Sequence, residues 1–112
     1  MSNEALEKML AKGMDNALLR FGLGKGYLDA GDFARAAEHL QRCVAFDPHY
    51  SAAWKLLGQA LNKQGLLEDA RQAWTHGLQV AQQKGDKQAE KEIGVFLRRL
   101  DKAANPPGQA GE

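Results

Sequence analysis

The sequence predicts an all-α fold in which helical hairpins stack side by side. Two observations carry this prediction. First, apolar residues recur every three or four positions over most of the chain, which is the period of an amphipathic helix, and no segment shows a strand pattern. Second, the chain resembles itself after a shift of 34 residues, so that residues 17–50 and 51–84 form two equivalent units. The matches at this shift are Leu23-Gly24 on Leu57-Gly58, Gly31 on Gly65, Phe33 on Leu67, Ala36 on Ala70, Leu40 on Trp74 and Val44 on Leu78.

Each unit is expected to be a pair of helices joined by a short turn. Gly31 and Gly65 stand where the first helix of each unit must end, because glycine accepts the left-handed conformation that closes a helix. Asp32 follows Gly31 and can cap the second helix of unit one. Pro48 ends that second helix, since the residue before a proline is pushed out of the α region.

Two glycines lie inside the predicted helices and call for a packing reason. Gly24 and Gly58 each cost about 1 kcal/mol relative to alanine in a helix interior. A close approach of the second helix of the same unit would explain them. Ala36 and Ala70 are small residues on those second helices, so we expect glycine to face alanine where the two helices cross.

The segments outside the two units are expected to complete a single domain of about six helices over residues 1–104. Residues 3–12 resemble half a unit, and their helix could pack on the first helix of unit one or fold onto the inner surface. Unit two has Gln82 in place of Pro48, so its last helix should run on to Gly85, with Asp86 capping the next helix. Residues 86–103 carry an apolar stripe backed by charges, as a capping helix requires. Residues 105–112 include Asn-Pro-Pro-Gly and are expected to be a disordered tail.

A 34-residue helical hairpin of this kind resembles the tetratricopeptide repeat. The resemblance covers residues 17–84. It is carried by Leu23, Gly24, Tyr27, Phe33, Ala36 and Pro48 in unit one and by Trp54, Leu57, Gly58, Leu61, Ala70 and Gly77 in unit two. It implies a right-handed α-solenoid with a concave groove lined by the first helix of each unit. Three positions depart from the family pattern, because Arg20 stands where an aromatic residue is usual, Cys43 replaces a small residue, and Gln82 ends unit two in place of a proline.

Composition and charge exclude several classes of partner. The 15 Lys and Arg nearly balance the 14 Asp and Glu, and no basic block could follow a phosphate backbone, so nucleic acid is not an expected partner. No apolar run approaches the length needed to cross a bilayer. Glu4, Glu7 and Lys8 stand where a secretory signal would be apolar, and the single cysteine cannot form an internal disulfide. We therefore expect a cytoplasmic protein.

No pattern in the chain predicts catalysis, a metal site or a cofactor. His39, His49 and His76 do not share a helix face at the spacing of a metal pair. His39 and Cys43 lie four apart and could form a base beside a thiol, but a buried small cysteine with His39 facing outward is the favoured interpretation. The glycine-rich run over residues 22–26 lacks the preceding strand that a phosphate-binding loop requires. A non-enzymatic protein is therefore expected.

The family resemblance assigns the groove to the first helix of each unit. The groove positions are Leu18, Phe21, Lys25, Leu28 and Asp29 in unit one and Ala52, Lys55, Gln59, Asn62 and Lys63 in unit two. Unit one supplies an apolar patch and unit two supplies amides and lysines, which favours a peptide with an apolar anchor and a carboxylate. Two alternatives stay open: the N-terminal helix covers the apolar patch, or the lysines form an ordinary solvated face.

Three functions are compatible with this sequence. The first is an adaptor or co-chaperone-like module, a monomer or weak homodimer, that holds a peptide or segment of a partner protein in its groove. The second is a structural subunit that self-associates through exposed apolar residues such as Leu66, which stands where unit one has Asp32. The third is a thiol-dependent enzyme or redox sensor at Cys43. We rank them in this order, with the enzyme far behind.

Overall fold

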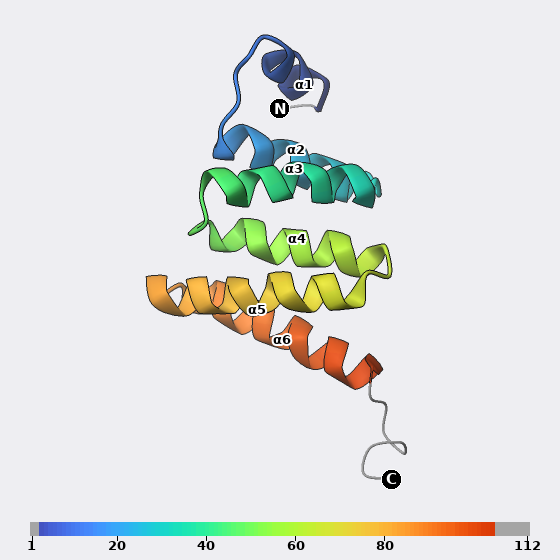
Figure 1. Cartoon of the computed structure of the whole chain (residues 1–112), viewed down its shortest axis with the longest axis vertical. Coiled ribbons are helices and arrows are strands. Elements are labelled where there is room, and N and C mark those ends of the chain that lie inside the picture. The colour runs from blue at the N-terminus through green and yellow to red at the C-terminus, as the bar shows by residue number, and fades with distance from the viewer. Residues whose placement is uncertain (1–2, 105–112) are drawn as a thin grey trace.

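The computed structural model describes residues 3–104, which form one stack of α-helices, with α1 at one end and α6 at the other (Figure 1). The predicted all-α solenoid is confirmed, and no strand occurs in these residues. The tail expected to be disordered, residues 105–112, lies outside the described range. The helices are α1 (Asn3–Ala11), α2 (Ala17–Asp29), α3 (Phe33–Phe46), α4 (Ser51–Lys63), α5 (Leu67–Lys84) and α6 (Lys87–Ala104).

Local signals in the sequence set most helix ends. Gly31, Gly65 and Gly85 follow α2, α4 and α5 with φ angles of 81°, 79° and 71°, the left-handed region that glycine adopts without strain. Asp32 caps α3, accepting a hydrogen bond from the amide of Arg35 at 3.2 Å. Asn16, which the sequence analysis overlooked, caps α2 in the same way by accepting from the amide of Leu19 at 2.8 Å.

The two helix-interior glycines do mark close approaches, but the pairing with alanine is wrong. A Cβ atom on Gly24 would overlap the side chain of Leu40, and one on Gly58 would overlap the indole of Trp74. Ala36 and Ala70 are completely buried, yet they are not the nearest neighbours of these glycines. Helical periodicity identifies the face on which a residue lies, whereas the crossing angle of the helices decides which residue of the partner lies opposite.

The core is a series of apolar clusters, each shared by neighbouring helices. Leu40, Cys43 and Val44 of α3 pack with Ala53 and Leu57 of α4. A second cluster, which joins α5 to α6, consists of Ala70, Trp74, Ala81, Ala89, Ile93 and Leu100. Because each helix buries its apolar face against its neighbours along the stack, the chain has the quasi-linear organisation of a solenoid.

The stack has an inner and an outer face. The backbone of α2 comes into contact with that of α4, and α4 with α6, so these three helices lie close together. Within residues 3–104 no such contact joins α1 with α3 or α3 with α5. The stack therefore curves with α2, α4 and α6 on its concave side, as the resemblance implied.

The two end helices differ in how they join the stack. The only helix that α1 contacts within the described range is α2, where Leu6 packs with Leu19 and Leu23, and it is seen nearly end-on in Figure 1 while α2 to α5 run across the view. This settles the open choice in favour of packing on the first helix of unit one. Helix α6 repeats α4 at a shift of 36 residues, because α5 is four residues longer than α3 and the connection that follows it is two residues shorter. The equivalent positions are Ala89 and Ala53, Ile93 and Leu57, Gly94 and Gly58, and Leu97 and Leu61.

Candidate functional site

The apolar patch predicted on α2 is divided between solvent and core. Leu18 is 73% exposed, so α1 does not cover it. Phe21 is half-buried and stacks on the ring of Tyr50, with ring centroids 4.7 Å apart and an angle of 16° between the planes. Phe21 also packs against the core cluster of Leu40 and its neighbours. Leu18 is thus available to a ligand, while much of Phe21 is already used in packing.

The polar end of the same helix is neutralised. Lys25 and Asp29 form an ion pair across one helical turn, with 3.1 Å between Nζ and Oδ2, and both side chains are exposed. Leu28 is half-buried beside them. This part of the inner face therefore presents a paired charge and a partly exposed apolar side chain.

Lys55 holds two helices together. Its ammonium group lies 3.0 Å from Oε1 of Glu92 on α6, and only 22% of its side chain is exposed. Its carbonyl oxygen accepts a hydrogen bond of 3.0 Å from the indole of Trp74. Lys55 is therefore less free than a groove lysine was expected to be, because it already has a carboxylate partner within the chain. Ala52, on the same helix, is half-buried.

The remaining groove positions of α4 line a pocket. Gln59, Asn62 and Lys63 border a cavity of about 360 Å³ that lies between α4, α5 and α6. The apolar part of its lining includes Trp74, Phe96 and Leu100, and the first two are stacked with ring centroids 5.2 Å apart. The pocket therefore combines an aromatic floor with amide and ammonium groups.

Helix α6 contributes to this pocket, which the repeat pattern did not predict. Phe96, Arg99 and Leu100 all lie on α6, which was interpreted only as a capping helix. Continuing the repeat to α6 would have identified a third inner helix. That signal is hidden because the shift from α4 to α6 is 36 residues instead of 34.

Cys43 lies in the core, whereas His39, which could have acted as its base, lines a surface groove. Cys43 is fully buried in the core, and burial raises the pKa of its thiol to about 11. His39 is half-buried and lines a surface groove beside α3, in agreement with the expectation that it faces outward. Its ring stacks on Tyr27 and its Nδ1 accepts a hydrogen bond from Arg20 at 3.1 Å. At neutral pH the thiol is protonated and the imidazole nitrogen is occupied.

The structure also places the glycine-rich run and the potential metal ligands of the described residues. Residues 22–26, the glycine-rich run, lie in the interior of α2 and form no loop. Over residues 3–104 no group of three or more His, Cys, Asp or Glu residues is placed to hold a metal ion. The same residues include no helix that is long and apolar enough to span a membrane.

Stacked helical hairpins with a pocket on their inner face define a helical-repeat protein of the solenoid class. A model of the tetratricopeptide repeat matches residues 21–85. The chain belongs to the tetratricopeptide repeat family, whose repeats generally mediate protein–protein interactions and are generally non-enzymatic.

Relatives agree with this assignment. The chain is 72% identical over 103 residues to the TPR repeat-containing protein PA0015 of Pseudomonas aeruginosa, covering 92% of this chain and 98% of that protein. The solution structure of protein BPP2914 from Bordetella parapertussis is 49% identical, with a TM-score of 0.83 over 98% of this chain and 96% of that one. A tetratricopeptide repeat domain protein from Salinibacter ruber, 21% identical, has the same fold, with a TM-score of 0.72 over 78% of this chain and 97% of its own.

Proposed function

We propose that the chain is an adaptor or co-chaperone-like module that holds a segment of a partner protein against its inner face. The observation that carries this proposal is the pocket between α4, α5 and α6. Trp74 and Phe96 give it an aromatic floor, and Lys63 and Arg99 lie in its lining. An apolar side chain of the partner would enter the pocket, and a carboxylate would be bound by the two cations.

The bound segment is an extended peptide that runs along the inner face from the pocket toward α2. There Leu18 offers a second apolar contact, because it is 73% exposed. The proposed groove residues are Leu18, Phe21, Lys25, Leu28, Asp29, Lys55, Gln59, Asn62 and Lys63, together with Phe96 and Arg99 from α6. The proposed module binds its partner without a cofactor. We also propose that it acts in the cytoplasm, as expected from the sequence.

The structure decides which substitutions test this function. Phe21→Ala and Lys55→Glu would follow from the sequence, but Phe21 packs in the core and Lys55 pairs with Glu92, so both changes would also perturb folding. Lys63→Glu and Leu18→Ser change exposed side chains and are better choices. Lys12→Glu is a matched control, because Lys12 is exposed and lies beyond the end of α1, outside the groove.

The experiment has two stages. A partner is first captured from the native host and identified, and its binding to the purified chain is then measured by isothermal titration calorimetry. We expect Lys63→Glu and Leu18→Ser each to weaken binding while Lys12→Glu leaves it unchanged, with equal circular dichroism spectra for all variants. Unchanged affinity in both groove variants would refute the proposal.

Self-association is a second candidate that one observation favours. Leu66 and Leu67 are 43% and 42% exposed at the start of α5, and Leu66 makes no side-chain capping bond there, unlike Asp32 in unit one. A second copy could cover these leucines. Sedimentation equilibrium at micromolar concentration distinguishes the candidates, because a clean monomer eliminates this one.

A further inference from the structure

The outer face of the stack has two grooves at equivalent places in the repeat. The first, about 880 Å³, lies between α1 and α3 with α2 as its floor, and the second, about 460 Å³, lies between α3 and α5 over α4. A shift of 34 residues relates six of their lining positions. The pairs are Glu7 and Gln41, Arg20 and Trp54, Arg35 and Asp69, Glu38 and Gln72, His39 and Ala73, and Arg42 and His76. Five of these six positions are acidic or basic residues other than histidine in the first groove, and only one of them, Asp69, is in the second. The two grooves therefore differ in chemistry although their positions correspond in the repeat.

Stacking of the helices does not require the charges of the first groove. Trp54 fills the floor of the second groove and packs against the neighbouring core cluster. Arg20 takes its place in the first groove with only 14% of its side chain exposed, and two of its nitrogens bind the carboxylate of Asp15 at 2.7 and 2.9 Å. A partly buried ion pair gives up hydration that an aromatic side chain would not need, and apolar residues often replace such pairs without loss of stability.

Arg20 and His39 form a fixed, neutral wall of this groove. An arginine can only donate, so the 3.1 Å contact from Arg20 Nη1 makes Nδ1 of His39 an acceptor and leaves the ring proton on Nε2. Burial lowers the pKa of His39, in agreement with a neutral ring. Tyr27 stacks on the ring of His39, and its hydroxyl donates a hydrogen bond of 2.8 Å to the carboxylate of Glu7. The carboxylate that α1 contributes to the groove therefore already has a partner.

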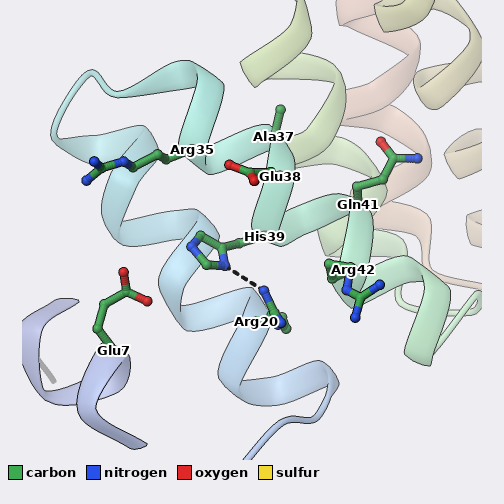
Figure 2. A pocket seen from close by; sticks show the side chains of 8 residues that line it. All are labelled: Glu7, Arg20, Arg35, Ala37, Glu38, His39, Gln41 and Arg42. Carbon is green, nitrogen blue, oxygen red and sulfur yellow. Dashed lines mark hydrogen bonds between the residues drawn. The ribbon is translucent and has the colours of Figure 1, made fainter. Parts of the chain in front are cut away.

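Three charged side chains that line the groove form one row along α3, and of these Arg35 also lies over the ring of Tyr27, 5.6 Å from its centroid. Arg35, Glu38 and Arg42 lie three and four residues apart and therefore on one face of the helix, as Figure 2 shows. The row extends for about 10 Å, seven residues at roughly 1.5 Å each. Over the described residues neither Glu38 nor Arg42 has an ion-pair partner within 4.0 Å, and Arg35 has only Asp32 at 3.6 Å.

We propose that the groove between α1 and α3 is a second binding surface, which takes a helix of a partner protein whose exposed row reads acidic, basic, acidic. Such a row, on residues three and four apart, matches the basic, acidic, basic order of Arg35, Glu38 and Arg42 at the same spacing. The groove of about 880 Å³ between α1 and α3 lies alongside this row. This surface lies on the opposite side of the stack from the peptide groove, so the chain can bind two partner segments at once.

Charge exchange tests the proposal. The probes are two alanine-based helical peptides, one with Glu, Lys and Glu and the other with Lys, Glu and Lys at positions i, i+3 and i+7. Binding is measured by NMR titration of the labelled chain at low salt. We expect the first peptide to bind at least about tenfold more tightly than the second, a difference of about 1.4 kcal/mol, with shifts at α3 and an affinity that falls as salt rises.

Variants of α3 complete the test. The triple variant Arg35→Glu, Glu38→Lys, Arg42→Glu should reverse the preference between the peptides, and the control Arg98→Glu, at an exposed site on α6, should leave it unchanged. If the triple variant does not fold, Arg42→Gln changes a single exposed side chain and should weaken the first peptide severalfold. Equal binding of both peptides, an unreversed preference in a folded triple variant, or full affinity in Arg42→Gln would overturn the proposal. Binding at the inner groove should be the same in all these variants, so the two proposals fail independently.

Discussion

The indole of Trp74 occupies the space in which a side chain of residue 58 would have to stand. Gly58 lies in the interior of α4, and a Cβ atom there would overlap the indole ring. Trp74 is only 2% exposed, and its Nε1 donates to the carbonyl of Lys55 at 3.0 Å, so the ring has a fixed position. The cost of a helix-interior glycine is thus offset by the burial of a large aromatic side chain.

The first prediction concerns this contact. Gly58→Ala should lower the free energy of unfolding by up to about 2 kcal/mol, because overpacking of a core costs about 1–3 kcal/mol and the gain in helix propensity returns about 1 kcal/mol. In urea unfolding, the change should appear as a lower midpoint concentration of urea, with an unchanged slope of the free energy of unfolding against urea.

Gly94→Ala is the matched control. Gly94 is the equivalent glycine of α6, and a Cβ there would meet only Arg98 Nη1 at 3.7 Å, an ordinary contact. This variant should be neutral or more stable by up to about 1 kcal/mol. Equal effects at the two glycines would contradict the assigned role of Trp74.

The second prediction is a pH dependence at the start of α6. Asp86 accepts hydrogen bonds from the hydroxyl of Ser51 at 2.8 Å and from the amide of Ala89 at 3.1 Å, and in that order these two bonds lower the pKa of its carboxyl. Asp86→Ala should destabilise the chain by about 1 kcal/mol at neutral pH through loss of the cap.

The difference in the free energy of unfolding between the wild-type chain and Asp86→Ala should depend on pH in a defined direction. Since the pKa of Asp86 is lower in the folded state, its stabilising effect is complete above the unfolded pKa of about 4 and is lost as the pH falls through the folded value. Urea unfolding at several pH values should show the two stabilities converging under acidic conditions. A gap that widens on acidification would mean that the carboxylate is not the stabilising form.

The third prediction separates the structural role of Lys55 from its proposed binding role. Lys55→Glu places two carboxylates together and should cost about 0.5–1 kcal/mol, and adding Glu92→Lys should restore most of this loss. If Lys55 also binds the partner, the double variant regains its melting temperature but not its affinity. Recovery of both would assign Lys55 to folding alone.

The fourth prediction concerns the buried thiol. Because burial raises the pKa of Cys43 to about 11, the thiolate fraction near neutral pH is very small. The side chain is also fully buried, so an alkylating reagent cannot reach it in the folded chain. Native protein should react with iodoacetamide far more slowly than urea-unfolded protein does. Rapid labelling of the native chain at pH 7.5 would revive the hypothesis of a reactive cysteine.

Local features of this fold were predictable from the sequence, whereas contacts between distant residues were not. Gly31, Gly65 and Asp32 act within a few residues of the helix ends that they define, so their roles follow from the chain itself. The neighbours of Gly24 and Gly58 depend on the angle at which two helices cross. The hydrophobic periodicity of the sequence does not determine that angle.

The site shows the same division. The apolar and polar groove positions were placed by analogy with the repeat, and the structure brings Gln59, Asn62 and Lys63 together at one pocket. The pairing of Lys55 with Glu92, 37 residues away, could not be anticipated, because long charged side chains choose partners only after the helices are packed. Arg20 was noticed as a departure from the family pattern, but its bonds to Asp15 and His39 became visible only in three dimensions.

The two tryptophans lie on opposite sides of the second hairpin. Trp54 lines the outer groove beside His76, with ring centroids 4.2 Å apart, and Trp74 forms part of the floor of the inner pocket. The chain therefore contains two natural fluorophores, one for each surface. Emission from a variant that keeps only one indole, such as Trp54→Phe, would report occupancy of a single face without any added dye.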